Sequence, residues 1–321
     1  MKLWSLCSLL VACVVSVSAC RGKPDAPPEP APVCSLRLPS HLAHTQPDAL
    51  PADIWYALLI KGYQPGSVPT DAVDCSGEPI AWPEVPESCT EHGAEGVVSS
   101  PNGRLADQLI VRHAGDDFWF GWAPLWTLDN GMVQGPIAIV RSKNGRLEAR
   151  ALGTLRAYRG RARLEVHHLP GGYVLSAEGE KCDLPEKGGC VRAIRLMYLD
   201  RQRFRGRPLR ASSIRSCLAP AWFPLSEAVK RKLDKRWVRT LQRNMAFGFT
   251  DYGIAVDESI RVFDTDASQP SLPARLFREA QSHINIRVVD GEFLSEGQSL
   301  WRSIRLEDAS LQDKEGGRSP F

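Results

Sequence analysis

The clearest structural signal in this chain is the stretch Ile137-Ala138-Ile139-Val140-Arg141-Ser142-Lys143-Asn144-Gly145-Arg146-Leu147. An apolar run rich in β-branched residues leads into Asn144-Gly145, and a second run follows from Leu147 to Leu155. Asn-Gly suits a type I′ turn because both central residues of that turn need a positive φ. The stretch therefore predicts two antiparallel strands joined by a tight hairpin.

Strand-like runs recur between Leu105 and Ala211, with turn signals about every dozen residues. The other runs lie at 109–111, 118–122, 164–167, 173–175 and 194–198. The other turn signals are Asn130-Gly131, Arg159-Gly160, Gly171-Gly172 and Gly188-Gly189. This pattern predicts a mainly β fold, an antiparallel meander that is barrel-like or stacks as two sheets. A pair of propeller blades is less favoured, because two blades cannot close a propeller.

The segment after this region has apolar residues at every fourth position. They are Leu225, Val229, Leu233, Trp237, Leu241 and Met245. This spacing is typical of one face of an amphipathic helix, and Ser226 after Pro224 could cap its first turn. Further strand-like runs follow at 253–256, 259–263, 284–289 and 300–306, with an Asp290-Gly291 turn. We therefore expect a C-terminal helix and additional strands packed on the β region.

The other face of this expected helix is basic. Its cations are Lys230, Arg231, Lys232, Lys235, Arg236, Arg239 and Arg243. Such a face could bind an anionic surface, with Lys230, Arg231, Lys235 and Arg239 as the contact residues. Glu227 and Asp234 interrupt the basic face, which equally suits an ordinary solvated helix surface.

An aromatic run, Asp116-Asp117-Phe118-Trp119-Phe120-Gly121-Trp122-Ala123-Pro124-Leu125-Trp126, offers a second candidate site. Strand alternation places Phe118, Phe120 and Trp122 on one side and Trp119 on the other. An exposed row of rings with Trp119, Trp122 and Trp126 beside Asp116 and Asp117 would suit stacking on sugars, whereas aromatic residues more often fill a core. A glycan hydrolase would need a carboxylate pair, drawn from Asp116, Asp117 or Glu165.

Other chemistry has little support in the sequence. His41-Leu-Ala-His44 lacks the Glu and the spacing of a zinc protease motif. The calcium-like start at Asp264-Thr265-Asp266 fails where the loop requires Gly and Glu. Nucleophile-elbow, nucleotide-binding and dinucleotide-binding motifs are absent from the sequence. We expect no metal and no cofactor, and a net charge of +3 is too small to indicate a nucleic-acid partner.

The first twenty residues predict export. A positive start at Met1-Lys2 and an apolar run from Leu3 to Val17 lead into Val17-Ser18-Ala19-Cys20. These last four residues resemble the lipobox of bacterial lipoproteins. The resemblance covers a processing signal only, and it implies that Cys20 becomes the acylated first residue of a mature protein held on a lipid bilayer. Arg21 in place of Asp makes the outer membrane the default destination. An ordinary cleaved signal peptide or an uncleaved helix is the alternative.

The chain then divides into five expected segments. These are a signal peptide at 1–19, a Pro-rich tether at 20–33, a loop-rich disulfide-braced segment at 34–104, an antiparallel β domain at 105–217, and a helix with β-hairpins at 218–321. Six cysteines remain after Cys20, and an even number in an exported chain indicates disulfides. Short loops favour Cys75 with Cys89 and Cys182 with Cys190, which leaves Cys34 with Cys217.

These observations lead to three functional hypotheses. The first is a non-enzymatic, lipid-anchored module of the cell envelope that meets a protein or glycan partner. The second is an envelope hydrolase acting on glycan. The third is anionic-surface binding through the basic face of residues 225–245.

Overall fold

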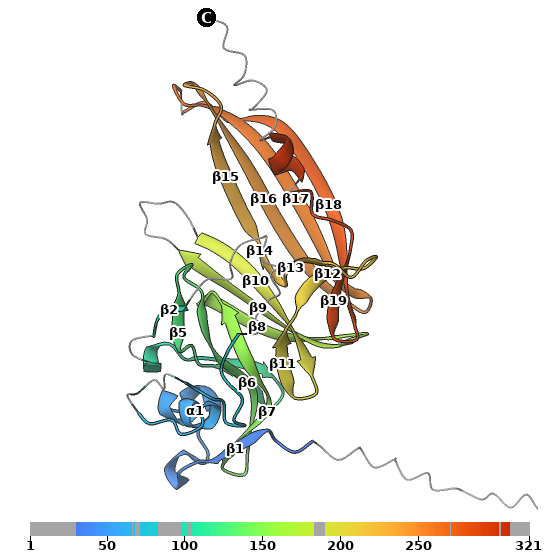
Figure 1. The fold of residues 1–321 in the computed structure, drawn as a ribbon. Helices are drawn as coiled ribbons and strands as arrows, with labels where there is room; N and C mark the ends of the chain where they lie inside the picture. Colours follow the sequence, from blue (N-terminus) through green and yellow to red (C-terminus); the bar gives the residue numbers. More distant parts are fainter. Residues whose placement is uncertain are drawn as a thin grey trace, which may run out of the picture. The chain divides into compact units, whose positions relative to one another are not determined.

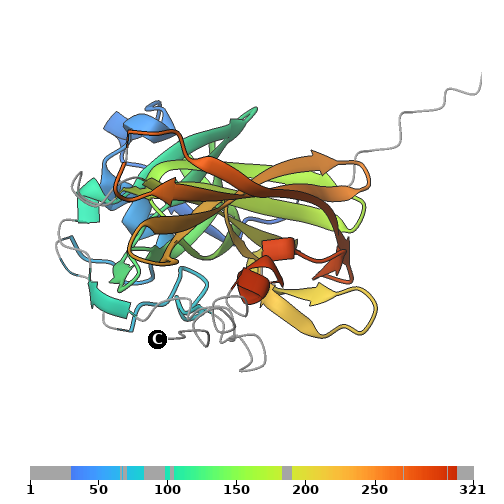
Figure 2. The ribbon, with the colours of Figure 1, turned by 90° about the horizontal axis from the view of Figure 1, so that it is seen from above.

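The computed structural model describes residues 30–65, 67, 71–82, 98–101, 105–182, 190–269, 271–301 and 303–308. These residues are mainly β, as predicted, and their strands form one sheet of 12 strands and another of seven (Figures 1 and 2). Of the three expected arrangements, a barrel-like meander, two sheets or a pair of propeller blades, the structure has two sheets. None of the helices in the described part is both long and apolar enough to cross a membrane. Cys20, the expected signal peptide and most of the tether lie outside the described residues.

The first sheet takes its strands from the first two-thirds of the described chain. They are β1 (Cys34–Arg37), β2 (Val98–Pro101), β3 (Ile110–Gly115), β4 (Phe118–Trp122), β5 (Trp126–Leu128), β6 (Val133–Lys143), β7 (Arg146–Ala157), β8 (Gly160–Leu169), β9 (Gly172–Cys182), β10 (Cys190–Asp200), β11 (Arg203–Gly206) and β14 (Trp222–Pro224). The hairpin predicted at Asn144-Gly145 is confirmed. Lys143 pairs with Arg146 across it, and Asn144 and Gly145 both have positive φ.

The first sheet departs from a simple meander where β11 inserts. Its main path runs β2-β5-β6-β7-β11-β10-β9-β8, so β11 lies between β7 and β10 and pairs with β7 in parallel. Gly153 permits this approach, because a Cβ there would lie only 2.6 Å from the carbonyl oxygen of Phe204. One face of this sheet curls around an apolar core that includes Phe120, Trp122 and Leu175.

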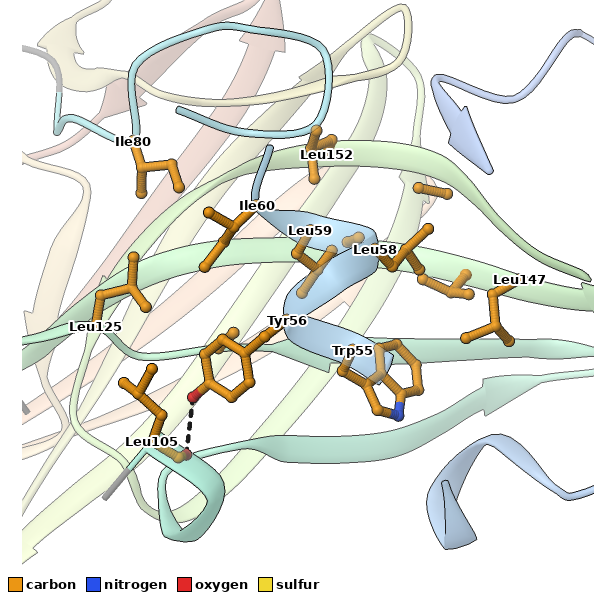
Figure 3. Packing of buried hydrophobic residues seen from close by; sticks show 14 of the residues in the cluster. Trp55, Tyr56, Leu58, Leu59, Ile60, Ile80, Leu105, Leu125, Leu147 and Leu152 are labelled. Atoms are coloured by element: carbon orange, nitrogen blue, oxygen red, sulfur yellow. Dashed lines mark hydrogen bonds between the residues drawn. The ribbon is translucent and has the colours of Figure 1, made fainter. Parts of the chain in front are cut away.

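Helix α1 (Ala52–Leu59) covers part of the first sheet (Figure 3). Pro51 precedes its first residue. Trp55 and Tyr56 are fully buried, and their polar atoms are satisfied by the carbonyls of Pro47 and Leu105. Short 3₁₀ helices η1 (Ser40–Leu42), η2 (Pro47–Ala49) and η4 (Leu105–Asp107) lie in the same part of the chain.

The second sheet is built from the last third of the chain. Its strands are β12 (Pro208–Ala211), β13 (Cys217–Pro220), β15 (Ser226–Lys232), β16 (Trp237–Thr250), β17 (Gly253–Asp266), β18 (Arg275–Val289) and β19 (Glu292–Glu296). The order is β13-β12-β19-β18-β17-β16-β15, antiparallel except between β12 and β19. Residues 300–301 and 303–308 are helical, and Trp301 and Ile304 pack on Leu241, Ile260 and Val262 of this sheet.

The helix expected over residues 225–245 is wrong, because this segment forms β15, a turn and most of β16. Its apolar residues all have odd numbers, so a spacing of four also places them on one face of a strand. Arg239 and Arg243 share this odd parity and are buried, whereas Gln242 and Asn244 are exposed. The period of two, not the spacing of four, therefore describes the segment.

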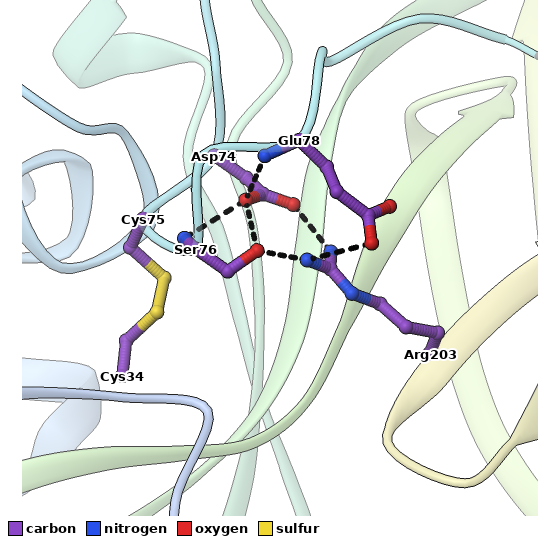
Figure 4. The surroundings of a disulfide bond; sticks show 6 residues. All are labelled: Cys34, Asp74, Cys75, Ser76, Glu78 and Arg203. Carbon is purple, nitrogen blue, oxygen red and sulfur yellow. Dashed lines mark hydrogen bonds and ion pairs between the residues drawn. A yellow bond between two sulfur atoms is a disulfide. The ribbon is translucent and has the colours of Figure 1, made fainter.

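Two of the three expected disulfides are also wrong. Cys182 pairs with Cys190 as predicted, and the two residues face one another across β9 and β10. Cys34, however, bonds to Cys75 at a sequence separation of 41 (Figure 4). Cys217 is disulfide-bonded, but not to Cys34, and Cys89 lies outside the described residues. The entropic cost of closing a loop grows only slowly with its length. The pairing of β1 with β7, which fixes the position of Cys34, therefore outweighs the preference for a short loop.

A charged cluster next to this disulfide fixes the same loop (Figure 4). Asp74 is buried and accepts hydrogen bonds from Ser76, from the Glu78 backbone and from Arg203 of β11. Burial alone would raise the pKa of Asp74, but the hydrogen bonds from Arg203 and Ser76 lower it overall. The cluster therefore ties the 71–82 segment to the first sheet.

Both sheets contribute to a third apolar core. Val174, Ile194 and Leu196 come from β9 and β10, whereas Met245 and Ile286 come from β16 and β18. Leu225 links the sheets through the backbone as well, because its N–H donates to the Arg192 carbonyl and its own carbonyl accepts from Met245. The junction between the sheets is therefore packed, and it forms the setting of the candidate site.

Candidate binding site

A cavity of about 470 Å³ lies where β16 passes over the face formed by β8, β9 and β10. This volume falls in the range of about 300 to 1,000 Å³ that is usual for ligand pockets. One wall is polar and comes from the first sheet. The other is largely apolar and comes from Leu225 and β16.

The polar wall follows from the register of three strands. Arg163 of β8 faces Glu178 of β9, and Glu165 faces Ser176. The intervening residues, such as Leu164, point into the core on the opposite face, so strand alternation turns the polar side chains toward the cavity. Arg192 of β10 joins them.

The charges on this wall are paired and stand at the cavity mouth. Arg163 donates to Glu165 at 2.8 Å, and Arg192 pairs with Glu178. Their four side chains are between 23% and 69% exposed. Two cations thus face two carboxylates, and the rim can offer both donors and acceptors to a ligand.

His167 lies deeper than the charged pairs. Its ring stacks on Phe249 of β16 with centroids 3.5 Å apart, and its Nε2 shares a 2.8 Å hydrogen bond with the hydroxyl of buried Ser176. Burial lowers the pKa of His167, and Glu165 only partly opposes this effect. The imidazole is therefore neutral at pH 7, and it acts as a bridge between the two sheets.

The opposite wall consists of four apolar side chains. They are Leu225, Met245, Phe247 and Phe249. Phe247 also contacts Phe223, with ring centroids 5.2 Å apart. Phe247 and Phe249 are only half-buried, so the cavity presents apolar surface opposite its paired charges.

Ser176, His167 and Glu165 do not have the geometry of a catalytic triad. In a triad the nucleophile and the acid contact different nitrogens of the imidazole. Here the Ser176 hydroxyl lies 2.8 Å from Nε2, and the nearer Glu165 carboxylate oxygen lies 3.8 Å from the same nitrogen. The arrangement therefore orients the imidazole between the sheets without activating the serine.

The aromatic run predicted from the sequence lies elsewhere. Trp122 is fully buried, and Trp119 and Trp126 are half-buried against the core beneath α1. The alternation was right, but a core covers each side of β4, so these rings form no exposed platform. Asp116 and Asp117 form the turn between β3 and β4 and are not among the described residues that line the cavity. Of the three carboxylates considered for hydrolysis, Glu165 alone reaches it.

The four basic candidates do not share one surface. Lys230 and Lys235 are exposed, but Arg231 pairs with Asp308 at 2.9 Å. Arg239 is buried and binds both Asp264 and Asp308, and the hydrogen bonds that it donates to Asp264 raise its pKa. Strand alternation thus turns Lys230 outward and brings the two arginines under the helical residues 303–308.

The cavity residues are not apparent in the sequence because they come from five strands, β8, β9, β10, β15 and β16. The signal that could have revealed them is the polar alternation at Arg163, Glu165 and His167, and again at Ser176 and Glu178. The expected turn at Gly171-Gly172 would have shifted their register. The structure places the turn at Pro170 and Gly171, with Leu169 facing Gly172.

Comparison with known proteins leaves the function to be argued from this geometry. No family model, no curated protein and no solved structure matches the chain.

Proposed function

We infer that this chain is a non-enzymatic, lipid-anchored protein of the cell envelope that binds a partner in the cavity between its two sheets. The observation that carries the binding function is the cavity of about 470 Å³ with a rim of paired charges and an apolar wall. A pocket of this kind can exclude water from a ligand and still orient it with polar groups.

The anchor is supported by the sequence Val17-Ser18-Ala19-Cys20. Burial of acyl methylenes contributes about 0.8 kcal/mol each, so several chains on one cysteine would hold the protein on a bilayer. Radiolabelled palmitate should enter the wild-type protein and should not enter the Cys20→Ala variant. An unmodified Cys20 in the mass of the mature protein would overturn the anchor.

The binding function can be tested in intact cells with a photo-crosslinking amino acid at Asn244, an exposed residue at the cavity rim. The matched control places the same amino acid at Arg261, whose exposed side chain pairs with Glu279 and is not among the described residues that line the cavity. We expect a discrete crosslinked product from position 244 alone. Equal products from both positions, or none from either, would contradict binding in the cavity.

A further inference from the structure

The cavity is bordered by an edge of β16 that has no partner strand. β15 pairs with β16 only from Val238 to Asn244, and the Met245 N–H then donates to the Leu225 carbonyl at 2.8 Å. Beyond Met245, no strand in the described part of the chain pairs with this side of β16. Five residues of β16, 246–250, therefore have an open edge.

The parity of the strand shows which backbone groups face this edge. Thr250 pairs with Gly253 across the two-residue turn to β17, and such a closing pair exchanges its hydrogen bonds within the hairpin. Even-numbered residues thus direct their N–H and C=O groups to β17. Odd-numbered residues direct theirs to the open side, as Met245 does, so Phe247 and Phe249 present unpaired donors and acceptors there.

We propose that the ligand of the cavity is an extended peptide segment of a partner protein, which adds as a strand to the open edge of β16 at residues 246–250. This inference rests on the binding function proposed above and names its ligand class. Strand addition supplies main-chain hydrogen bonds, and adjoining side-chain pockets supply selectivity.

Three features favour a peptide over a sugar or an acyl chain. The groups of Phe247 and Phe249 repeat every second residue, which matches the backbone of an extended chain. The edge is about 17 Å long at 3.4 Å per residue, enough for a short strand. The facing wall carries two cations and two carboxylates, a surface that disfavours buried hydrocarbon.

Strand geometry also predicts the selectivity of the site. Alternate side chains of an added strand would point to the same side as Met245, Phe247 and Phe249, toward the paired charges of Arg163 and Arg192. The other side chains would point outward with Asn244 and Ala246, which are exposed. We expect polar residues at every second position of a bound peptide and free variation between them.

The experiment begins with the protein purified in detergent and a phage-displayed library of linear heptapeptides. An enriched peptide is then synthesised with a single N-methyl group at each position in turn. N-methylation should weaken binding by about tenfold or more at alternate positions only, because alternate N–H groups face the strand edge. A peptide that binds without this period of two would overturn strand addition.

Amide exchange of the unmodified protein gives an independent readout. Without peptide, the amides of Phe247 and Phe249 should exchange faster than those of Ala246 and Gly248, which face β17. Peptide should slow Phe247 and Phe249 and leave the other two unchanged. If no peptide is enriched but position 244 still crosslinks specifically, strand addition is wrong and the binding function stands. If both fail, the binding function is wrong as well.

Discussion

Two histidines illustrate how position decides the chemistry of one residue type. His283 stands on the exposed face of β18, where its Nδ1 contacts Asp257 at 2.7 Å and its Nε2 contacts Asn285 at 3.1 Å. The hydrogen bond to Asp257 raises the pKa of His283. His167 is half-buried at the junction of the sheets, and this burial lowers its pKa. The two residues should therefore titrate on opposite sides of 6.5.

This difference yields a prediction for Asp257→Asn. The substitution should lower the pKa of His283 and leave that of His167 unchanged, as measured by NMR titration of the imidazole protons. Since the folded-state pKa of His283 lies above 6.5, its pairing with Asp257 stabilises the protein fully below pH 6.5. This contribution is lost as the pH rises through the folded-state pKa. A stability difference between variant and wild type that is the same on both sides of this interval would contradict the assignment.

A glycine in β4 provides a second prediction. A Cβ at Gly121 would lie 2.3 Å from the Trp55 ring of α1, whereas a Cβ at Gly248 of β16 would meet nothing closer than 3.9 Å. Gly121→Ala should reduce the free energy of unfolding by about 1 to 3 kcal/mol through overpacking. Gly248→Ala, the matched control, should change it by less than about 0.5 kcal/mol. Urea unfolding would measure both, and equal effects would show that α1 does not pack on Gly121.

At the scale of elements, the helical residues 300–301 and 303–308 depend on one buried carboxylate. Glu258 of β17 is 2% exposed, and it accepts hydrogen bonds from the Ser299 hydroxyl at 2.6 Å and the Leu300 N–H at 2.8 Å. It also accepts from Ser282 of β18, and Arg243 lies 3.9 Å away. The carboxylate therefore caps the start of the helix and holds it on the second sheet.

Removing this carboxylate should release the helix. Glu258→Ala should cost about 3 kcal/mol of stability, because it leaves the Leu300 N–H without its acceptor and buried Arg243 short of a partner. The substitution should also raise the hydrogen exchange of residues 300–301 and 303–308. Glu279→Ala, which removes an exposed pair with Arg261, is the control and should cost less than about 1 kcal/mol. Unchanged exchange in Glu258→Ala would show that Trp301 packing alone holds the helix.

The elements also show what the sequence could and could not predict. The hairpin at Asn144-Gly145 was predictable, because the turn type demands those residues and the flanking runs alternate. The segment 225–245 was ambiguous, since apolar residues four apart satisfy both a helix face and a strand face. Arg239 and Arg243 are expected on an exposed polar face, but both are buried. The sequence does not reveal this, because residue spacing does not identify their carboxylate partners, Asp264 and Glu227.

The whole molecule adds long-range order that local patterns do not contain. β11 inserts in parallel beside β7. β14 pairs with β10 of the first sheet, although the strands before and after it in the sequence, β13 and β15, belong to the second sheet. The Cys34–Cys75 bond and the cavity likewise join residues that are far apart in the sequence. Side chains such as Arg163 and Phe249 become neighbours of one cavity only once both sheets have formed, so the candidate site was beyond local analysis.

The shared core leads to a prediction for unfolding of the entire body. The described residues from Pro32 onward belong to one compact unit, and Ile194 and Met245 from different sheets lie in the same core. Neither sheet can unfold without exposing apolar surface of the other, so thermal unfolding should be a single transition whose calorimetric and van't Hoff enthalpies agree. Gly121→Ala in the first sheet and Glu258→Ala in the second should each shift this same transition, by about 2 °C or more per kcal/mol lost. Two separated transitions, of which each variant shifts only one, would show that the sheets are energetically independent. The cavity at their junction would then lack the fixed walls that ligand binding requires.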